Sequence, residues 1–135
     1  MKRLLLLCFA CAIACVASAQ NIITYTNTKQ VVNGVEHEGN YSQLQIVFDG
    51  NKLKLPQYSS LTYLYDHQEN GWSIYYYAVW NNWGGQWQLF KNDWYAVSPD
   101  RQTLNKGGRA VNGGALIVNV YKEGVQHKSI GPMYE

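Results

Sequence analysis

Beyond residue 19 the chain contains no cysteine, because its three cysteines are Cys8, Cys11 and Cys15. The segment that holds them, residues 1–19, has two basic residues, then an apolar run and then Ala17-Ser18-Ala19. This is the layout of a secretory signal peptide, and the apolar run is too short for a spanning helix. We therefore predict a signal peptide over 1–19 and one domain over 20–135, which neither disulfides nor thiolate-bound metals can stabilise.

A signal peptide implies export, so we expect the protein in the periplasm, at the cell surface or outside the cell. Residues 12–15, Ala-Ile-Ala-Cys, loosely resemble a bacterial lipobox, which would place an acylated Cys15 at a membrane. The first position of that motif is usually Leu and is Ala here. Cleavage after Ala19 is therefore favoured over lipid anchoring at Cys15.

The predicted mature domain also lacks an excess of charge. Without Lys2 and Arg3 the 11 basic residues fall to nine, which equals the number of acidic residues. Nucleic-acid binding usually needs a clustered Lys/Arg surface, so this balance disfavours it. No second long apolar run follows the signal, and we expect no membrane span.

Helical periodicity is absent over any three turns of the mature chain. Instead, strand patterns alternate with turn signals: Asn33-Gly34 between β-branched pairs predicts a type I′ hairpin, and residues 42–55 alternate as a half-buried hairpin that ends before Pro56. Further strands are predicted at 61–65, 72–80, 86–91 and 94–98, with a polar turn over 66–71. The Gly- and Asn-rich stretch 98–114 predicts a long loop, and 115–130 a last hairpin. We predict an all-β domain, a small antiparallel meander of short strands closed as a barrel or folded as a sandwich.

Aromatic residues are unusually dense over 71–87, which holds four of the five tryptophans. Strand 72–80 is apolar on both faces, with Tyr75, Tyr77 and Val79 on one. For Trp72, Ile74, Tyr76 and Trp80, on the other face, the favoured interpretation is core packing, since large rings fill small β domains.

Trp83 differs from these aromatics because it stands in the turn 81-NNWGG-85, where the chain should reach the surface. An indole face can stack on the apolar face of a sugar ring while nearby amides bind its hydroxyls. We therefore predict a ligand-binding site in which Trp83 and Tyr75 or Tyr77 stack, and Asn81, Asn82 and Gln86 supply hydrogen bonds. The alternative is that Trp83 folds back over its own hairpin.

Catalytic and metal-binding patterns are missing. The carboxylates show no pair that spacing would place together for glycoside hydrolysis, and the serines no nucleophile elbow. The histidines His37, His67 and His127 have no zinc-ligand spacing, and no glycine motif precedes a helix. We expect no enzyme, metal or cofactor, although a small hydrolase stays an open alternative.

The favoured interpretation is a secreted, non-catalytic binding module whose ligand is a glycan or polysaccharide. The rival is a structural or protein-interaction module that uses the aromatic strand 72–80 as an interface with a protein partner or a second copy of itself. A nearly neutral domain self-associates more easily, which favours the rival.

Overall fold

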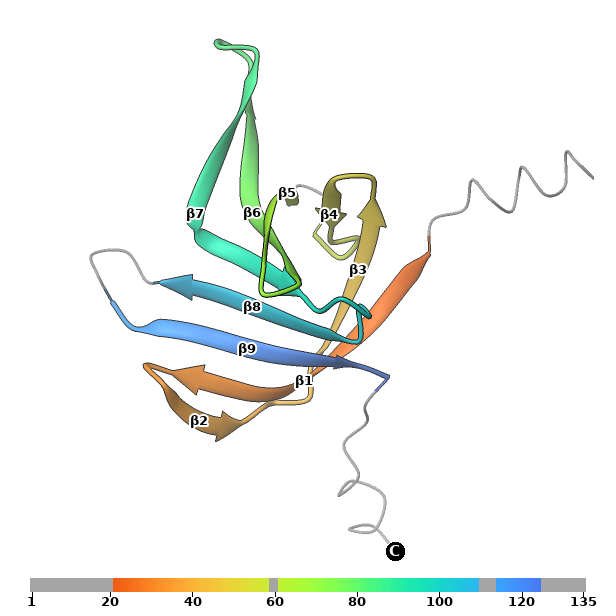
Figure 1. The fold of residues 1–135 in the computed structure, drawn as a ribbon, viewed down its shortest axis with the longest axis vertical. Coiled ribbons are helices and arrows are strands. Elements are labelled where there is room, and N and C mark those ends of the chain that lie inside the picture. The colour runs from red at the N-terminus through yellow and green to blue at the C-terminus, as the bar shows by residue number, and fades with distance from the viewer. Residues whose placement is uncertain (1–20, 59–60, 110–113, 125–135) are drawn as a thin grey trace, which may run out of the picture.

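The computed structural model describes residues 21–58, 61–109 and 114–124, which form nine antiparallel strands (Figure 1). These are β1 (Ile22–Val32), β2 (Val35–Glu38), β3 (Gln43–Asp49), β4 (Lys52–Lys54), β5 (Thr62–Glu69), β6 (Trp72–Asn81), β7 (Gln86–Val97), β8 (Thr103–Arg109) and β9 (Leu116–Glu123). The predicted all-β meander is confirmed. The described residues include no helix that is long and apolar enough to cross a membrane.

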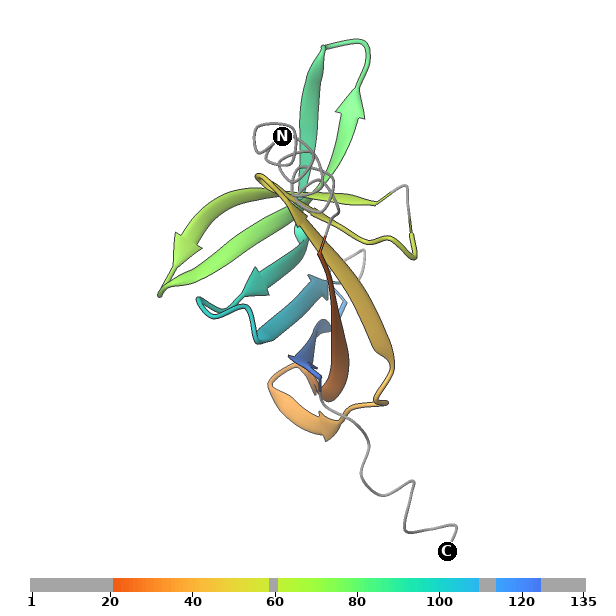
Figure 2. The same cartoon turned by 90° about the vertical axis from the view of Figure 1, so that its right-hand side faces the viewer.

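The sheet closes into a barrel because β1 pairs on both of its edges. Its first half, Ile22–Thr26, pairs with β3, and its other edge pairs with β9. Strands β1 and β3–β9 thus form an eight-stranded barrel, which decides between the predicted barrel and sandwich. Strand β2 lies outside this ring and pairs with the second half of β1 (Figures 1 and 2).

Two tight turns follow from residues that tolerate positive φ. Asn33 and Gly34 have φ of 48° and 83° between β1 and β2, which confirms the predicted hairpin. Asn70 and Gly71 repeat these values at 53° and 84°. The polar turn predicted over 66–71 is therefore too long: β5 continues to Glu69, with a register shift between Tyr65 and His67.

The core fills the barrel with large side chains, and packing takes the place of the missing disulfides. On the predicted inner face of β3 and β4, Leu44, Ile46 and Leu53 are buried and Phe48 is half-buried. The predicted alternation is incomplete, because Val47 on the opposite face is also only 2% exposed. Each such side chain stabilises the fold by roughly 1.5–3 kcal/mol. Tyr25 is fully buried, and its hydroxyl donates to the backbone oxygen of Arg101 at 2.6 Å. The same packed cluster also contains Leu55, Tyr63, Tyr75, Tyr95, Val97 and Leu104.

The long loop predicted over 98–114 is wrong over most of its described length, because residues 103–109 form β8 between β7 and β9. The glycines there fit a strand for a packing reason. A Cβ on Gly107 would lie 2.0 Å from the ring of Trp94, so that ring can cross β8 only over a glycine. Of the predicted hairpin over 115–130, the structure describes one strand, β9, and Gly124. The remainder of that hairpin lies outside the described residues, as does the predicted signal peptide.

Strand β7 is continuous where two short strands were predicted, but it has a large bulge. Tyr76 pairs with Trp94 while the next residue, Tyr77, pairs with Phe90, so residues 91–93 have no partner on β6. Bulges bend a strand pair and increase its twist. Beyond this one, residues 77–90 extend from the barrel as a ribbon, here called the arm (Figures 1 and 2). Tyr77 and Ala78 at its base still pair with β5, and the ribbon is two-stranded from Val79 to Gln88.

Candidate functional site: the arm and the barrel mouth

The tip of the arm presents Trp83 to solvent with its side chain 100% exposed, so the indole does not fold back over its hairpin. The turn beneath it is fixed by Asn81, whose Oδ1 accepts from the backbone N–H groups of Trp83 and Gly84 at 3.0 and 3.3 Å. Gly85 completes the turn with φ of 63° and donates to the Asn81 carbonyl at 2.8 Å. The sequence 81-NNWGG-85 therefore forms a turn of fixed backbone conformation that carries an exposed indole ring.

The predicted site residues fall into two groups. Asn82 and Gln86 are exposed at the tip beside Trp83, and Asn81 keeps its Nδ2 for a further bond. Tyr77 is half-buried at the base of the arm, where its ring packs on Phe90 at 5.4 Å, and four residues of strand place it roughly 13 Å from Asn81. Tyr75 is only 5% exposed and belongs to the core, so it is not part of any surface with Trp83.

Both faces of the arm expose apolar side chains, although Lys52 Nζ lies 5.5 Å from the ring centroid of Trp87. Trp80 and Trp87 lie opposite each other on one face, with ring centroids 5.5 Å apart and planes at 73°. Trp80 is 48% exposed, so its predicted place in the core is wrong: the bulge takes the end of β6 beyond any layer that could cover it. Val79 and Phe90 are exposed on the opposite face. Of the other residues predicted as core, Ile74 is buried, while Trp72 and Tyr76 are half-buried.

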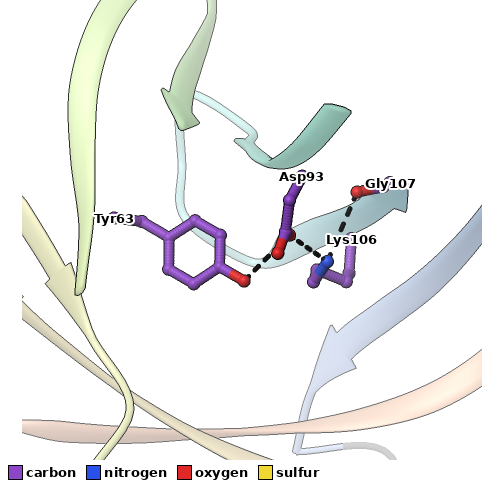
Figure 3. Close-up of polar contacts among 4 residues, drawn as sticks. All are labelled: Tyr63, Asp93, Lys106 and Gly107. Carbon is purple, nitrogen blue, oxygen red and sulfur yellow. Dashed lines mark hydrogen bonds and ion pairs between the residues drawn. The ribbon is translucent and has the colours of Figure 1, made fainter. Parts of the chain in front are cut away.

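The same bulge turns Asp93 toward the end of the barrel below the arm, here called the mouth. The Tyr63 hydroxyl donates to Asp93 Oδ1 at 2.9 Å, and Lys106 Nζ forms an ion pair with the same oxygen (Figure 3). Lys106 also donates to the Gly107 carbonyl at 3.3 Å. Its ammonium lies 5.8 and 5.4 Å from the ring centroids of Tyr63 and Tyr95, within range of cation–π attraction.

Burial is the main cause that raises the pKa of Tyr63 far above its ordinary value, and neighbouring Tyr95 and Asp93 raise it further. The phenol therefore stays protonated and remains a donor to Asp93 throughout the neutral range. Asp93, Lys106 and Tyr63 are thus held in one hydrogen-bonded group at the inner wall of the mouth.

An open cavity of about 340 Å³ lies beside this group. It is lined by Asn92, Asp93, Lys106, Gly107, Gly108, Arg109, Ile117 and Asn119. Its volume is at the small end of the roughly 300–1,000 Å³ typical of small-molecule sites. A smaller cavity of about 210 Å³ lies on the outer face of β5–β7, where it is lined by His67, Glu69, Ile74, Tyr76, Lys91 and Trp94.

Sequence reasoning missed the mouth because its groups come from positions 63, 93 and 106, which no local spacing connects. Asp93 lies between the predicted strands 86–91 and 94–98, and Lys106 lies inside the predicted loop 98–114. The available signal was strand alternation: Asp93 and Tyr95 face inward together, as do Leu104 and Lys106 on the neighbouring strand. This alternation can be recognised only when residues 103–109 are assigned to a strand.

Among the residues that line the mouth, Asp93 is the one carboxylate, whereas glycoside hydrolases typically use a pair. In the part of the chain that the structure describes, no three His, Cys, Asp or Glu side chains gather as a metal site. Comparisons of the chain with protein-family models, curated proteins and solved structures return no match.

Proposed function

We propose that the protein is an exported, non-catalytic binding module that holds a glycan at the tip of the arm. The observation behind this is the complete exposure of Trp83 on a turn that Asn81 fixes. Covering about 100 Å² of the indole with the apolar face of a sugar would contribute about 2.5 kcal/mol. Asn82, Gln86 and the Nδ2 of Asn81 lie beside the ring and can bind the hydroxyl groups.

The test compares wild type with Trp83→Ala on a glycan array and by titration with mixed soluble polysaccharides, followed by tryptophan fluorescence with acrylamide. We expect the wild type to bind, its quenching to fall when polysaccharide is present, and Trp83→Ala to lose at least about tenfold in affinity, equivalent to about 1.4 kcal/mol.

Trp87→Phe is the matched control, because Trp87 lies on a face of the arm and not at its tip. This variant should bind as the wild type does. Unchanged array signals for a folded Trp83→Ala protein would contradict the proposal.

A second candidate function is self-association through the arm, favoured by the exposed apolar side chains on both of its faces. The occupant would be a second copy of the chain, because residues 20–135 carry nine basic and nine acidic residues, which removes net repulsion between copies of this domain. Light scattering across a hundredfold dilution tests this. A mass that falls on dilution, and that is monomeric throughout in Trp80→Gln, supports the interface; a constant monomer contradicts it.

A further inference from the structure

The mouth owes its open space to a glycine on the inward face of β8. Gly108 pairs with Asp93 on one side and with Ile117 on the other. A Cβ at Gly108 would meet only ordinary contacts, 3.5 Å from the Asn92 carbonyl oxygen and 3.9 Å from Lys106 Nζ. Its φ is not in the left-handed region, so neither strain nor close packing requires glycine there. This differs from Gly107, where Trp94 leaves no room.

Hydrogen-bonding groups with unused capacity converge on this space. Asp93 Oδ1 receives both Tyr63 and Lys106, while Oδ2 receives no hydrogen bond within the described structure. Asn119 Oδ1 accepts from Asn27 and Gln30 at 3.3 and 3.2 Å, which orients the amide and leaves its Nδ2 as a donor. A carboxylate acceptor and an amide donor, each fixed by other bonds, therefore line the same cavity.

The charge of the mouth selects against ions. Lys106 and Asp93 neutralise each other within one ion pair. Arg109 lies exposed at the rim, where its Nη1 donates to the Gly114 carbonyl at 3.3 Å and water screens it. An anion would be attracted by Lys106 and repelled by Asp93, and a cation would be attracted by Asp93 and repelled by Lys106. An uncharged ligand with adjacent hydroxyl groups can instead donate to Asp93 and accept from Asn119 and Lys106.

Ile117 completes the recognition, since its side chain is exposed in the cavity wall and can contact C–H groups. We propose that the mouth is a binding site for a small uncharged polyhydroxylated ligand, a single sugar residue. Asp93 Oδ2 and Asn119 Nδ2 bind neighbouring hydroxyls, and the ligand occupies the space above Gly108. This site is separate from the tip of the arm and does not depend on Trp83.

The test is an NMR titration of the ¹⁵N-labelled protein with glucose, galactose, mannose and N-acetylglucosamine, each at millimolar concentration, with sodium acetate and sodium phosphate as ionic probes. We expect at least one sugar to shift the amide signals of Gly107, Gly108 and Asn119, and both salts to leave them in place. Gly108→Val fills the cavity and should abolish the shifts. Trp83→Ala should leave them unchanged, which separates this site from the glycan site proposed at the tip.

Asn119→Asp provides a second variant in case Gly108→Val distorts the strand. It keeps an oxygen that can receive Asn27 and Gln30, but it replaces the Nδ2 donor by an acceptor oxygen and adds a negative charge to the cavity that Asp93 lines. We expect it to fold and to bind the sugar about fivefold to tenfold more weakly, as for one lost hydrogen bond. The proposal is overturned if none of the four sugars shifts the mouth signals, if a salt shifts them instead, or if both variants bind as the wild type does.

Discussion

The two halves of the β6–β7 hairpin place similar side chains in opposite surroundings. Inside the barrel Tyr75 lies opposite Tyr95, and the two are 5% and 2% exposed. Further along the same pair of strands Trp80 lies opposite Trp87, and these are 48% and 36% exposed. The ladder of paired residues continues through both halves, and only the bulge at 91–93 separates them. A high density of aromatic residues in the sequence therefore does not show whether a strand lies in the core or at the surface. That depends on whether other parts of the fold cover the strand.

The difference also has an energetic side. The barrel half has neighbours on its inner face, whereas most of the arm is a two-stranded ribbon, which is marginally stable by itself. The arm therefore depends on the barrel for its anchorage, while the barrel gains little from the arm. Each prediction below tests this asymmetry, from the largest expected effect to the smallest.

Alkaline pH should unfold the barrel through its tyrosines. Burial raises the pKa of Tyr25 to about 12 and also raises the pKa values of Tyr63, Tyr75, Tyr95 and Tyr121 above the ordinary 10. Because the folded pKa is the higher one, these groups stabilise the fold fully below pH 10, and the free energy of unfolding falls as pH rises from 10 through 12. Circular dichroism and phenolate absorbance should change together in that window. Complete phenolate formation by all 11 tyrosines before any change in ellipticity would contradict this.

Leu104→Ala and Leu89→Ala make the same change in the two regions. Leu104 is fully buried in the barrel, and its truncation should lower the free energy of unfolding by about 2–5 kcal/mol. Leu89 is 38% exposed on the arm, and the same truncation there should change the free energy of unfolding by at most about 0.5 kcal/mol. Urea denaturation of both variants measures the contrast. Equal losses would mean that the arm is part of the core.

Adjacent glycines of β8 give a finer comparison. Gly107→Ala forces a methyl group into the ring of Trp94 and should destabilise the barrel by about 1–3 kcal/mol. Gly108→Ala adds the same methyl group toward the open mouth and should be tolerated. Thermal unfolding distinguishes them, and a lower melting temperature for Gly108→Ala than for Gly107→Ala would be inconsistent with the described packing.

Removal of one hydroxyl group should have the smallest effect. Tyr63→Phe removes the hydrogen bond to Asp93 and should cost about 1 kcal/mol. Tyr65 is 40% exposed on the same strand, and Tyr65→Phe should leave the free energy of unfolding unchanged. Chemical denaturation of the two proteins in parallel provides the measurement. A loss in Tyr65→Phe that matches that in Tyr63→Phe would show that the Asp93 bond adds nothing.

The sequence predicts the parts of this fold that local chemistry determines. Asn33-Gly34 specifies its hairpin because few other pairs adopt two consecutive positive φ values, and the alternation of residues 43–46 specifies which face is buried. Strand β8 is missed because Gly107 and Gly108 look like loop residues until the ring of Trp94 is placed above one of them. The exposure of Trp80 and the contact between Asp93 and Lys106 both follow from the bulge in β7. No local sequence pattern predicts the size of that bulge.

The pairing of β1 with β9 sets the order of events when the chain folds. Tyr25 pairs with Glu123 and Val32 with Ile117, so the first strand meets its partner only after nearly the whole domain has been made. Contacts this distant in sequence give a high contact order, and folding in the range of milliseconds to seconds is expected for such barrels. Until β9 arrives, β1 and β8 each present an open edge that another chain could pair with. Closure is therefore the step at which this protein is most exposed to aggregation.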